Sequence, residues 1–263
     1  MSDKKAPPPG GGNPNLATLL SVIVLLIAAA CIILAVVIPQ IPQLSKLQLP
    51  TATTNPTTQA TVTAEDDIPA FDPSLLILVN ESHPLPEDYT VSLMAMSDWP
   101  LYVESAIFED LQAMLYDGMA EGYYFQVLAA YRNADEQQYY FDEKVKEYIQ
   151  QGYSQSSAER EASLYEQPSG KSDYQTGLSV AIVSGAYQQM DEAQGTTEET
   201  RWLHEHCHEY GFVLRYPEGK SSETGIPYKP WHYRYVGREA AAFLTEHNLT
   251  LEEYWRQYGS VSN

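Results

Sequence analysis

The chain has 263 residues, of which 15 are Lys or Arg and 35 are Asp or Glu, so its formal net charge at pH 7 is −20. Because binding to phosphates requires a basic surface, this charge excludes nucleic acid as the expected partner. The hydrophobic content of 44% is sufficient for a packed core, and two cysteines are too few for a disulfide scaffold or a cysteine-based zinc site.

The N-terminal part predicts a membrane anchor. Residues 16–38 form an apolar run without a charged side chain, and a helix of this length spans the roughly 30 Å hydrocarbon core of a bilayer. The sequence AAAC at 28–31 resembles a lipoprotein cleavage box, but the apolar run continues past it and favours an uncleaved transmembrane helix. Lys4 and Lys5 precede the run, which favours a cytoplasmic tail over residues 1–15 and places the rest of the chain outside the cell.

Residues 39–74 form a segment rich in proline and threonine. Pro39, Pro42, Pro50 and Pro56 break helices. The segment has too little apolar surface to offset the entropy lost on ordering it. We therefore expect an extracytoplasmic stalk that holds the folded part away from the bilayer.

Residues 75–263 have the composition of one globular domain. Hydrophobic periodicity predicts helices over residues 104–120 and 134–150, and capping boxes predict helix starts at Thr196-x-x-Glu199 and Thr250-x-x-Glu253. Strands are predicted over residues 123–131, 177–183, 212–216 and 231–236. Because these helices and strands do not alternate regularly, they favour a single α+β domain over a doubly wound sheet.

Four segments of this domain carry a family resemblance. They are LVNESHPLPEDY (78–89), AAYRNADEQ (129–137), SDYQTGLSVA (172–181) and YGFVLRYPEGK…TGIPYKPWHYRYVG (210–237). In this order they resemble VanY-type D-alanyl-D-alanine carboxypeptidases, zinc peptidases that remove the terminal D-alanine of the peptidoglycan stem peptide. The resemblance implies a small antiparallel sheet with surrounding helices.

The resemblance also implies a zinc site, and this sequence departs from it. The family uses S-x-H-x-x-G-x-x-x-D and a later E-P-W-H, in which two histidines and the aspartate bind zinc and the glutamate is the general base. The three ligand positions fall on Tyr174, Ala181 and His232, and the general-base position falls on Lys229. An open zinc site needs three protein ligands and a base. Since only His232 matches, we expect neither bound zinc nor an intact catalytic residue.

Other residues restore the metal site only in part. A tyrosinate can bind metals, so Tyr174 keeps that alternative open, whereas Ala181 has no donor atom. Asp173 adjoins a lost ligand, but neighbouring side chains of an extended segment point to opposite faces. The positive charge of Lys229 opposes cation binding, and this amine is no base at neutral pH unless its pKa falls by several units.

Four further residues are candidates for substrate binding, three of which match positions of the resembling family's cleft. Arg132 matches an arginine near the scissile end, where a guanidinium suits a carboxylate or a carbonyl oxygen. The alternative for Arg132 is a salt bridge between two elements. Gln137 and Ser172 match positions that line the family's cleft, with local hydrogen bonding as the alternative, and Trp231 is either a core residue or part of the ligand platform.

The run from His204 to Glu209 contains three histidines. His204 and His208 are four residues apart, the spacing of a two-histidine metal clamp on a helix. No third ligand is evident, so His204, His206 and His208 are either a surface cluster on a solvated face or an additional metal site. Cys207 is expected to be a buried free thiol.

Together these features predict a single-pass protein of a bacterial cell membrane. Its extracytoplasmic domain is expected to be a catalytically inactive carboxypeptidase relative that binds a peptidoglycan stem peptide or a cell-surface protein. Two alternatives remain open: an active zinc D,D-carboxypeptidase with a rebuilt metal site, and a structural scaffold with a vestigial cleft.

Overall fold

The computed structural model of the protein describes residues 71–259. The predicted cytoplasmic tail, the transmembrane helix at 16–38 and nearly all of the stalk lie outside these residues and stay predictions. Between residues 71 and 259 no helix is both long and apolar enough to cross a bilayer. The ring of Phe71 packs 5.5 Å from that of Phe243, so ordered packing begins four residues before the expected domain start at Leu75.

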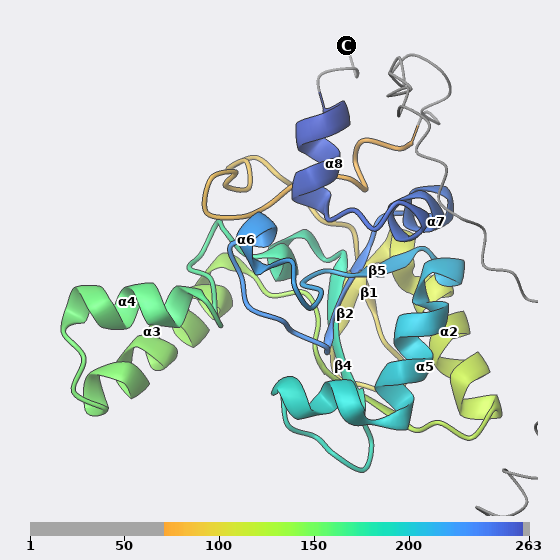
Figure 1. The fold of residues 1–263 in the computed structure, drawn as a ribbon, viewed down its shortest axis with the longest axis horizontal. Coiled ribbons are helices and arrows are strands. Elements are labelled where there is room, and N and C mark those ends of the chain that lie inside the picture. The colour runs from red at the N-terminus through yellow and green to blue at the C-terminus, as the bar shows by residue number, and fades with distance from the viewer. Residues whose placement is uncertain (1–70, 260–263) are drawn as a thin grey trace, which may run out of the picture. The chain divides into compact units, whose positions relative to one another are not determined.

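A four-stranded antiparallel sheet lies at the centre of the domain (Figure 1). Its strands are β3 (Phe125–Ala129), β4 (Ser179–Ser184), β6 (His232–Tyr235) and β5 (Phe212–Leu214), in the order β3-β4-β6-β5. A separate two-stranded sheet pairs β1 (Leu93–Ala95) with β2 (Tyr102–Glu104). The four predicted strands are present, with ends that shift by two residues at most. This confirms the predicted α+β domain with a small antiparallel sheet.

Helices surround this sheet. The α-helices are α2 (Phe108–Ala120), α3 (Ala134–Gln150), α4 (Gln155–Ser163), α5 (Glu198–His206), α6 (Ser221–Thr224), α7 (Arg238–Glu246) and α8 (Leu251–Tyr258). Short 3-10 helices are η3 (Ser105–Ile107), η4 (Asp173–Thr176), η5 (Glu192–Thr196) and η6 (Cys207–Tyr210). Helix α3 has the predicted bounds, whereas helices α4, α6 and α7 were not predicted from the sequence.

One of the two predicted capping boxes is present. The side chain of Thr250 accepts a hydrogen bond from the backbone N–H of Glu253, whose carboxylate accepts one from the Thr250 N–H. The predicted box at Thr196 is wrong by one residue, because Thr197 caps α5 and accepts from the Thr200 N–H at 3.2 Å. Thr196 instead ends η5, where its hydroxyl donates to the Ala193 carbonyl.

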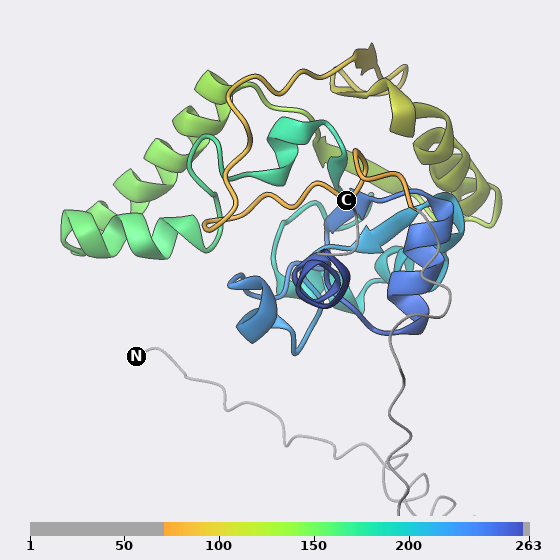
Figure 2. The ribbon, with the colours of Figure 1, turned by 90° about the horizontal axis from the view of Figure 1, so that it is seen from above.

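The two faces of the sheet have different partners. Helices α2 and α5 cover one face, where their apolar side chains form the main core with alternate residues of the strands. The opposite face carries a smaller cluster that includes Ala181 of β4. Helices α3 and α4 form a hairpin that lies at the other side of the domain from α2 (Figures 1 and 2). The sheet face that carries Ala181 is therefore the face on which a site can form.

A β-bulge in β3 changes which residues reach this second face. Val127 pairs with Ile182, whereas Ala129 pairs with Ala181, so Leu128 is an additional residue on β3. Paired residues of an antiparallel sheet share a face, so the bulge moves Ala129 away from the main core and places it beside Ala181. The chain then leaves β3 toward Arg132.

A buried ion-pair network ties the ends of several elements together. The carboxylate of Asp173, at the start of η4, accepts hydrogen bonds from Arg215 Nε at 2.6 Å and from Arg234 Nη1 at 2.7 Å. Arg215 also forms a bidentate pair with Glu252 of α8 at 2.8 and 2.7 Å. Arg234 Nη2 donates to the carbonyls of Leu75 and Ile77 in the N-terminal segment. The side chains of Asp173, Arg215 and Arg234 are all essentially inaccessible to water.

This network predicts a large effect of the isosteric substitution Asp173→Asn. Removing this charge leaves Arg215 with Glu252 as its carboxylate partner and leaves the buried Arg234 without one among the described residues, and breaking such a pair costs about 3–5 kcal/mol of stability. The measurement is urea unfolding of the purified protein. The matched control is Glu143→Gln, which removes an exposed carboxylate paired with Lys146 and should leave the midpoint unchanged. Equal midpoints for the two variants would contradict a structural role for Asp173.

Candidate functional site

The structure brings together the four residues at the predicted zinc and general-base positions. Ala181 of β4 lies directly opposite His232 of β6 in the strand register. The ring of Tyr174, from η4, lies over the His232 ring with centroids 4.7 Å apart and planes inclined by 32°. Lys229 precedes β6 in a turn in which the His232 N–H donates to the Lys229 carbonyl at 3.1 Å. The positions converge as the family pattern requires.

Local sequence explains how η4 reaches the sheet. Ser172 is the N-cap of η4, and its hydroxyl accepts a hydrogen bond from the Tyr174 N–H at 3.4 Å. Gly177 ends η4 with φ of 72°, a left-handed conformation that favours glycine. A Cβ atom there would lie 2.9 Å from the backbone nitrogen of Glu104. The glycine therefore permits both the turn into β4 and the close approach of the last residue of β2.

The centre of the site is apolar and closely packed. Tyr174, Ala181 and Trp231 belong to one buried cluster with Ala129 and Val183. Burial raises the pKa of the Tyr174 hydroxyl far above its usual value, so this side chain is a neutral phenol and not a tyrosinate. A rebuilt metal site with Tyr174 as a ligand would need that phenol to ionise.

His232 is a buried neutral imidazole. It is 2% exposed, and its ring packs between Tyr174 and the ring of Tyr216, whose centroid is 4.9 Å away. Burial, and then the charge of nearby Lys229, hold the pKa of His232 well below its usual range. Its Nε2 atom has no hydrogen-bond partner among the described residues. This free nitrogen could bind a metal ion, but it is only one of the three protein ligands that a catalytic zinc site needs.

The side chains at these positions do not fit a zinc ion. His232 supplies one nitrogen, Ala181 supplies no donor, and Tyr174 supplies a neutral phenol whose ring packs in a tilted arrangement against the imidazole. Within residues 71–259 no three His, Cys, Asp or Glu side chains lie close enough to hold a metal ion. The carboxylate of Asp173 offers no substitute, because Arg215 and Arg234 bind both of its oxygens.

The expected backbone around Asp173 was wrong in one respect. Residues 173–176 form a 3-10 helix and not an extended segment. The Asp173 side chain nevertheless points away from the His232 ring that Tyr174 contacts, because its carboxylate binds the two arginines of the buried network.

Lys229 is a buried cation that donates to a backbone carbonyl. Its Nζ lies 2.7 Å from the carbonyl oxygen of Tyr165 and 5.2 Å from the centroid of the Tyr216 ring. Burial lowers the pKa of Lys229 to about 8. Because Nζ donates to the Tyr165 carbonyl, the structure places the residue as a hydrogen-bond donor.

Arg132 is enclosed on three sides. Its Nη1 donates to Glu166 Oε2 at 2.8 Å and to Gln137 Oε1 at 3.3 Å. Its Cζ lies 4.0 Å from the ring centroid of Tyr140 and 4.6 Å from that of Tyr174. The alternative predicted for Arg132, a salt bridge, is thus present: Arg132 pairs with Glu166. The pair lies beside Tyr174, at one of the predicted zinc positions.

The other predicted substrate-binding residues make local contacts. Gln137 is fully buried, and its side chain donates to the carbonyl of Gln167 at 2.6 Å. Ser172 caps η4, and Trp231 is 7% exposed within the apolar cluster. These contacts match the alternatives of local hydrogen bonding and core packing. Of these residues, Gln137 also accepts a hydrogen bond from Arg132 Nη1.

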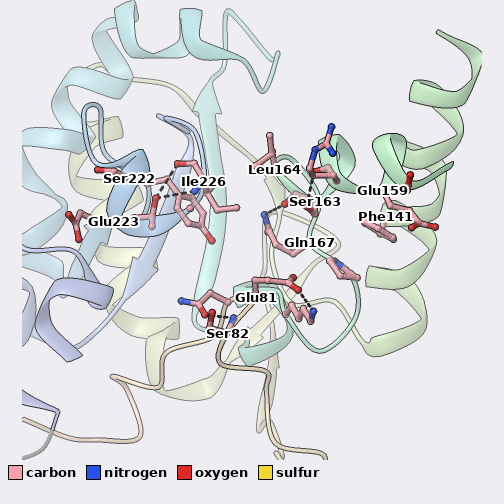
Figure 3. Close-up of a pocket in the computed structure, with 18 residues that line it drawn as sticks. Glu81, Ser82, Phe141, Glu159, Ser163, Leu164, Gln167, Ser222, Glu223 and Ile226 are labelled. Atoms are coloured by element: carbon pink, nitrogen blue, oxygen red, sulfur yellow. Dashed lines mark hydrogen bonds and ion pairs between the residues drawn. The ribbon is translucent and has the colours of Figure 1, made fainter. Parts of the chain in front are cut away.

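A cavity of about 720 Å³ opens next to this site (Figure 3). Its walls come from the α3–α4 hairpin, the loop at 80–82 and the segment around α6, as the labelled side chains of Figure 3 show. Tyr216 and Gln167 belong both to the cavity wall and to the surroundings of the site. The lining is rich in hydroxyl, amide and carboxylate groups, which suits a polar ligand such as a peptide.

The three histidines near α5 do not converge. His204 Nε2 lies 3.3 Å from the Pro230 carbonyl, and burial lowers its pKa. His206 packs on Trp202 and contacts Glu209, while His208 Nδ1 is buried without a partner among the described residues. The expectation of one solvated face is wrong, because all three side chains are partly buried. Cys207 is a buried free thiol, as expected.

Sequence reasoning missed several residues that shape the site. Glu166, Tyr165 and Tyr140 contact the two cations, and Tyr216 packs on His232. Nothing in the spacing of Glu166 and Tyr165 marks them, because they reach the site from the end of α4. Tyr216 lies within one of the segments that carry the resemblance, and that position was its only available signal.

Comparisons with known proteins agree with this geometry. A family model described as VanY, D-alanyl-D-alanine carboxypeptidase, matches residues 100–238. A D-alanyl-D-alanine carboxypeptidase of Enterococcus faecalis (strain ATCC 700802 / V583) is 39% identical over 180 residues, which cover 68% of this chain and 65% of that protein. The chain thus spans slightly less than two thirds of that relative's length.

Two solved structures are similar over most of the described domain. One is a variant of the vancomycin-resistance D,D-pentapeptidase VanY from a VanB-type cassette in complex with Zn(II), with 38% identity, a TM-score of 0.63 and coverage of 69% of this chain and 98% of that one. The other is VanYB in complex with D-alanine-D-alanine, with 38% identity, a TM-score of 0.63 and coverage of 69% and 97%. The chain belongs to the VanY D-alanyl-D-alanine carboxypeptidase family.

Proposed function

We propose that this family member is a catalytically inactive binding protein of the bacterial cell surface, which recognises a peptidoglycan stem peptide without cleaving it. One observation carries the proposal: the Tyr174 side chain stands at the position of a metal-binding histidine, and its ring packs against that of His232, the one ligand that remains. Ala181, opposite His232 in the sheet, contributes no donor. An apolar contact therefore stands where the family has a metal centre.

The loss of hydrolysis follows from the groups that remain. Peptide hydrolysis by this family requires an activated water and a carboxylate that removes its proton. Lys229 stands at the carboxylate's position, and its Nζ is engaged as a donor to the Tyr165 carbonyl. Neither requirement is met by the residues around His232.

Ligand binding has better support. Arg132 keeps a guanidinium beside Tyr174 of the site, and the neighbouring cavity of about 720 Å³, whose wall includes Gln167, is large enough for a short peptide. The related VanYB has been solved with D-alanine-D-alanine. By analogy we propose a stem peptide that contains D-alanine as the ligand here. A cell-surface protein as partner is the outcome to consider if no such peptide binds.

The location belongs to the same proposal. The apolar run at 16–38 would anchor the chain in the cell membrane, and the segment at 39–74 would carry the family domain toward the cell wall. The alkylation pattern of single cysteines introduced at Ser2 and Ser260 in intact cells tests this orientation. Only the C-terminal cysteine should react with an impermeant reagent.

Repair of the site should require all lost groups together. Tyr174→His with Ala181→Asp should create zinc binding, and Lys229→Glu should be needed in addition for release of D-alanine from an acyl-D-Ala-D-Ala peptide. Ligands and base act as a unit, so each single substitution should give almost no activity. Metal content and D-alanine release are measured, with circular dichroism to verify folding. Full activity from one substitution, or a folded triple variant without zinc, would contradict the assignment of positions.

Binding should depend on Arg132. An acyl-D-Ala-D-Ala peptide should bind the wild-type protein weakly and remain intact, and Arg132→Ala should remove a charge-assisted hydrogen bond worth about 1.5–3 kcal/mol. The expected loss of affinity is roughly 10- to 150-fold. NMR titration provides the measurement, with Arg201→Ala as control, since Arg201 is exposed on α5 and does not line the cavity. No binding by the wild type at millimolar peptide would favour the scaffold alternative.

A further inference from the structure

The guanidinium of Arg132 already has an internal carboxylate partner. Two tyrosine rings cover its faces, at 4.0 Å for Tyr140 and 4.6 Å for Tyr174, and Glu166 binds Nη1 at 2.8 Å. The Arg132 and Glu166 side chains are only 9% and 19% exposed. Within residues 71–259 the Nε and Nη2 atoms have no hydrogen-bond partner, so one edge of the fork is left for a ligand.

The segment that carries Glu166 is held in place. The backbone N–H groups of Tyr165 and Glu166 both donate to the Ala162 carbonyl, at 2.9 and 2.8 Å, and so continue the last turn of α4. The next residue, Gln167, donates from its side chain to the Ser163 carbonyl and accepts from Gln137. Glu166 is therefore a positioned group and not a mobile surface side chain.

Neighbouring residues of this segment satisfy both cations of the site. The Tyr165 carbonyl accepts from Lys229 Nζ at 2.7 Å, and the Glu166 carboxylate accepts from Arg132 at 2.8 Å. The segment thus offers the site a carbonyl and a carboxylate, the same two groups that the end of a peptide ligand would offer. A ligand that brings its own carboxylate must share Arg132 with the carboxylate of Glu166.

We infer that Glu166 determines the end-group specificity of this cleft, so that the group of the ligand that meets Arg132 is an uncharged amide carbonyl in preference to a free terminal carboxylate. The inference deepens the proposed function and rests on it for the identity of the ligand as a peptide. An amide carbonyl accepts from the free edge of the guanidinium without repulsion, whereas a carboxylate there is repelled by Glu166 at short range in a poorly solvated site. The corresponding ligand class is a peptide that is amidated or continues past this residue.

The test compares two small probes that need only Arg132. N-acetyl-D-alanine and N-acetyl-D-alaninamide are titrated into the full-length chain, and the Nε–Hε NMR signal of Arg132 reports binding. Glu166→Gln removes the competing charge and keeps the shape. The matched control is Glu161→Gln, which removes a carboxylate that is paired with Arg160 on α4. Glu166→Asp is the conservative variant and should behave as the wild type.

Glu166→Gln should tighten binding of the carboxylate probe by about tenfold or more and change binding of the amide probe by less than about twofold. Glu161→Gln should change neither. A merely structural role of Glu166 would alter both probes alike, and that result, or no response of Arg132 to the carboxylate probe in Glu166→Gln, would overturn the inference. If the probes respond as expected but no D-alanine-containing stem peptide binds any variant, the inference stands and the proposed function fails.

Discussion

The buried carboxylate of Asp173, shared between Arg215 and Arg234, is the interaction on which the site depends. It holds the start of η4 against strands β5 and β6 and, through Glu252, against α8. The next residue, Tyr174, is consequently fixed over His232. Such a pair costs desolvation energy and stabilises only while every partner is present, so it acts as a geometric constraint more than as a source of stability.

Around that constraint, two of the three residues at the family's metal-ligand positions differ from the family pattern. The three ligand positions still converge from η4, β4 and β6, but an aromatic ring and a methyl group now meet the remaining imidazole. The two cations beside it are engaged by one short segment after α4, through the Tyr165 carbonyl and the Glu166 carboxylate. Both changes work against water activation, and both leave a shaped, partly polar cleft next to a cavity.

Much of this arrangement could be predicted from sequence, and the exceptions have physical causes. The strands and α3 follow from local hydrophobic patterns, and the convergence of Tyr174, Ala181, Lys229 and His232 follows from the motif spacing of the family. The partners of the buried charges did not follow. Glu166 meets Arg132 across 34 residues and Arg234 meets Asp173 across 61, and no local pattern encodes such pairs. Thr196 was mistaken for the cap of α5 because two adjacent threonines offer the same chemistry, and only the backbone decides between them.

The central claim is that the site around His232 no longer forms a zinc centre. The most direct measurement is the zinc content of the purified full-length protein after exposure to zinc and exhaustive dialysis, together with assay of D-alanine release from an acyl-D-Ala-D-Ala peptide. With a single imidazole donor where a catalytic site needs three protein ligands, the account predicts far less than one equivalent of zinc and no release. Close to one equivalent of zinc, lost on substitution His232→Ala and accompanied by D-alanine release, would contradict it.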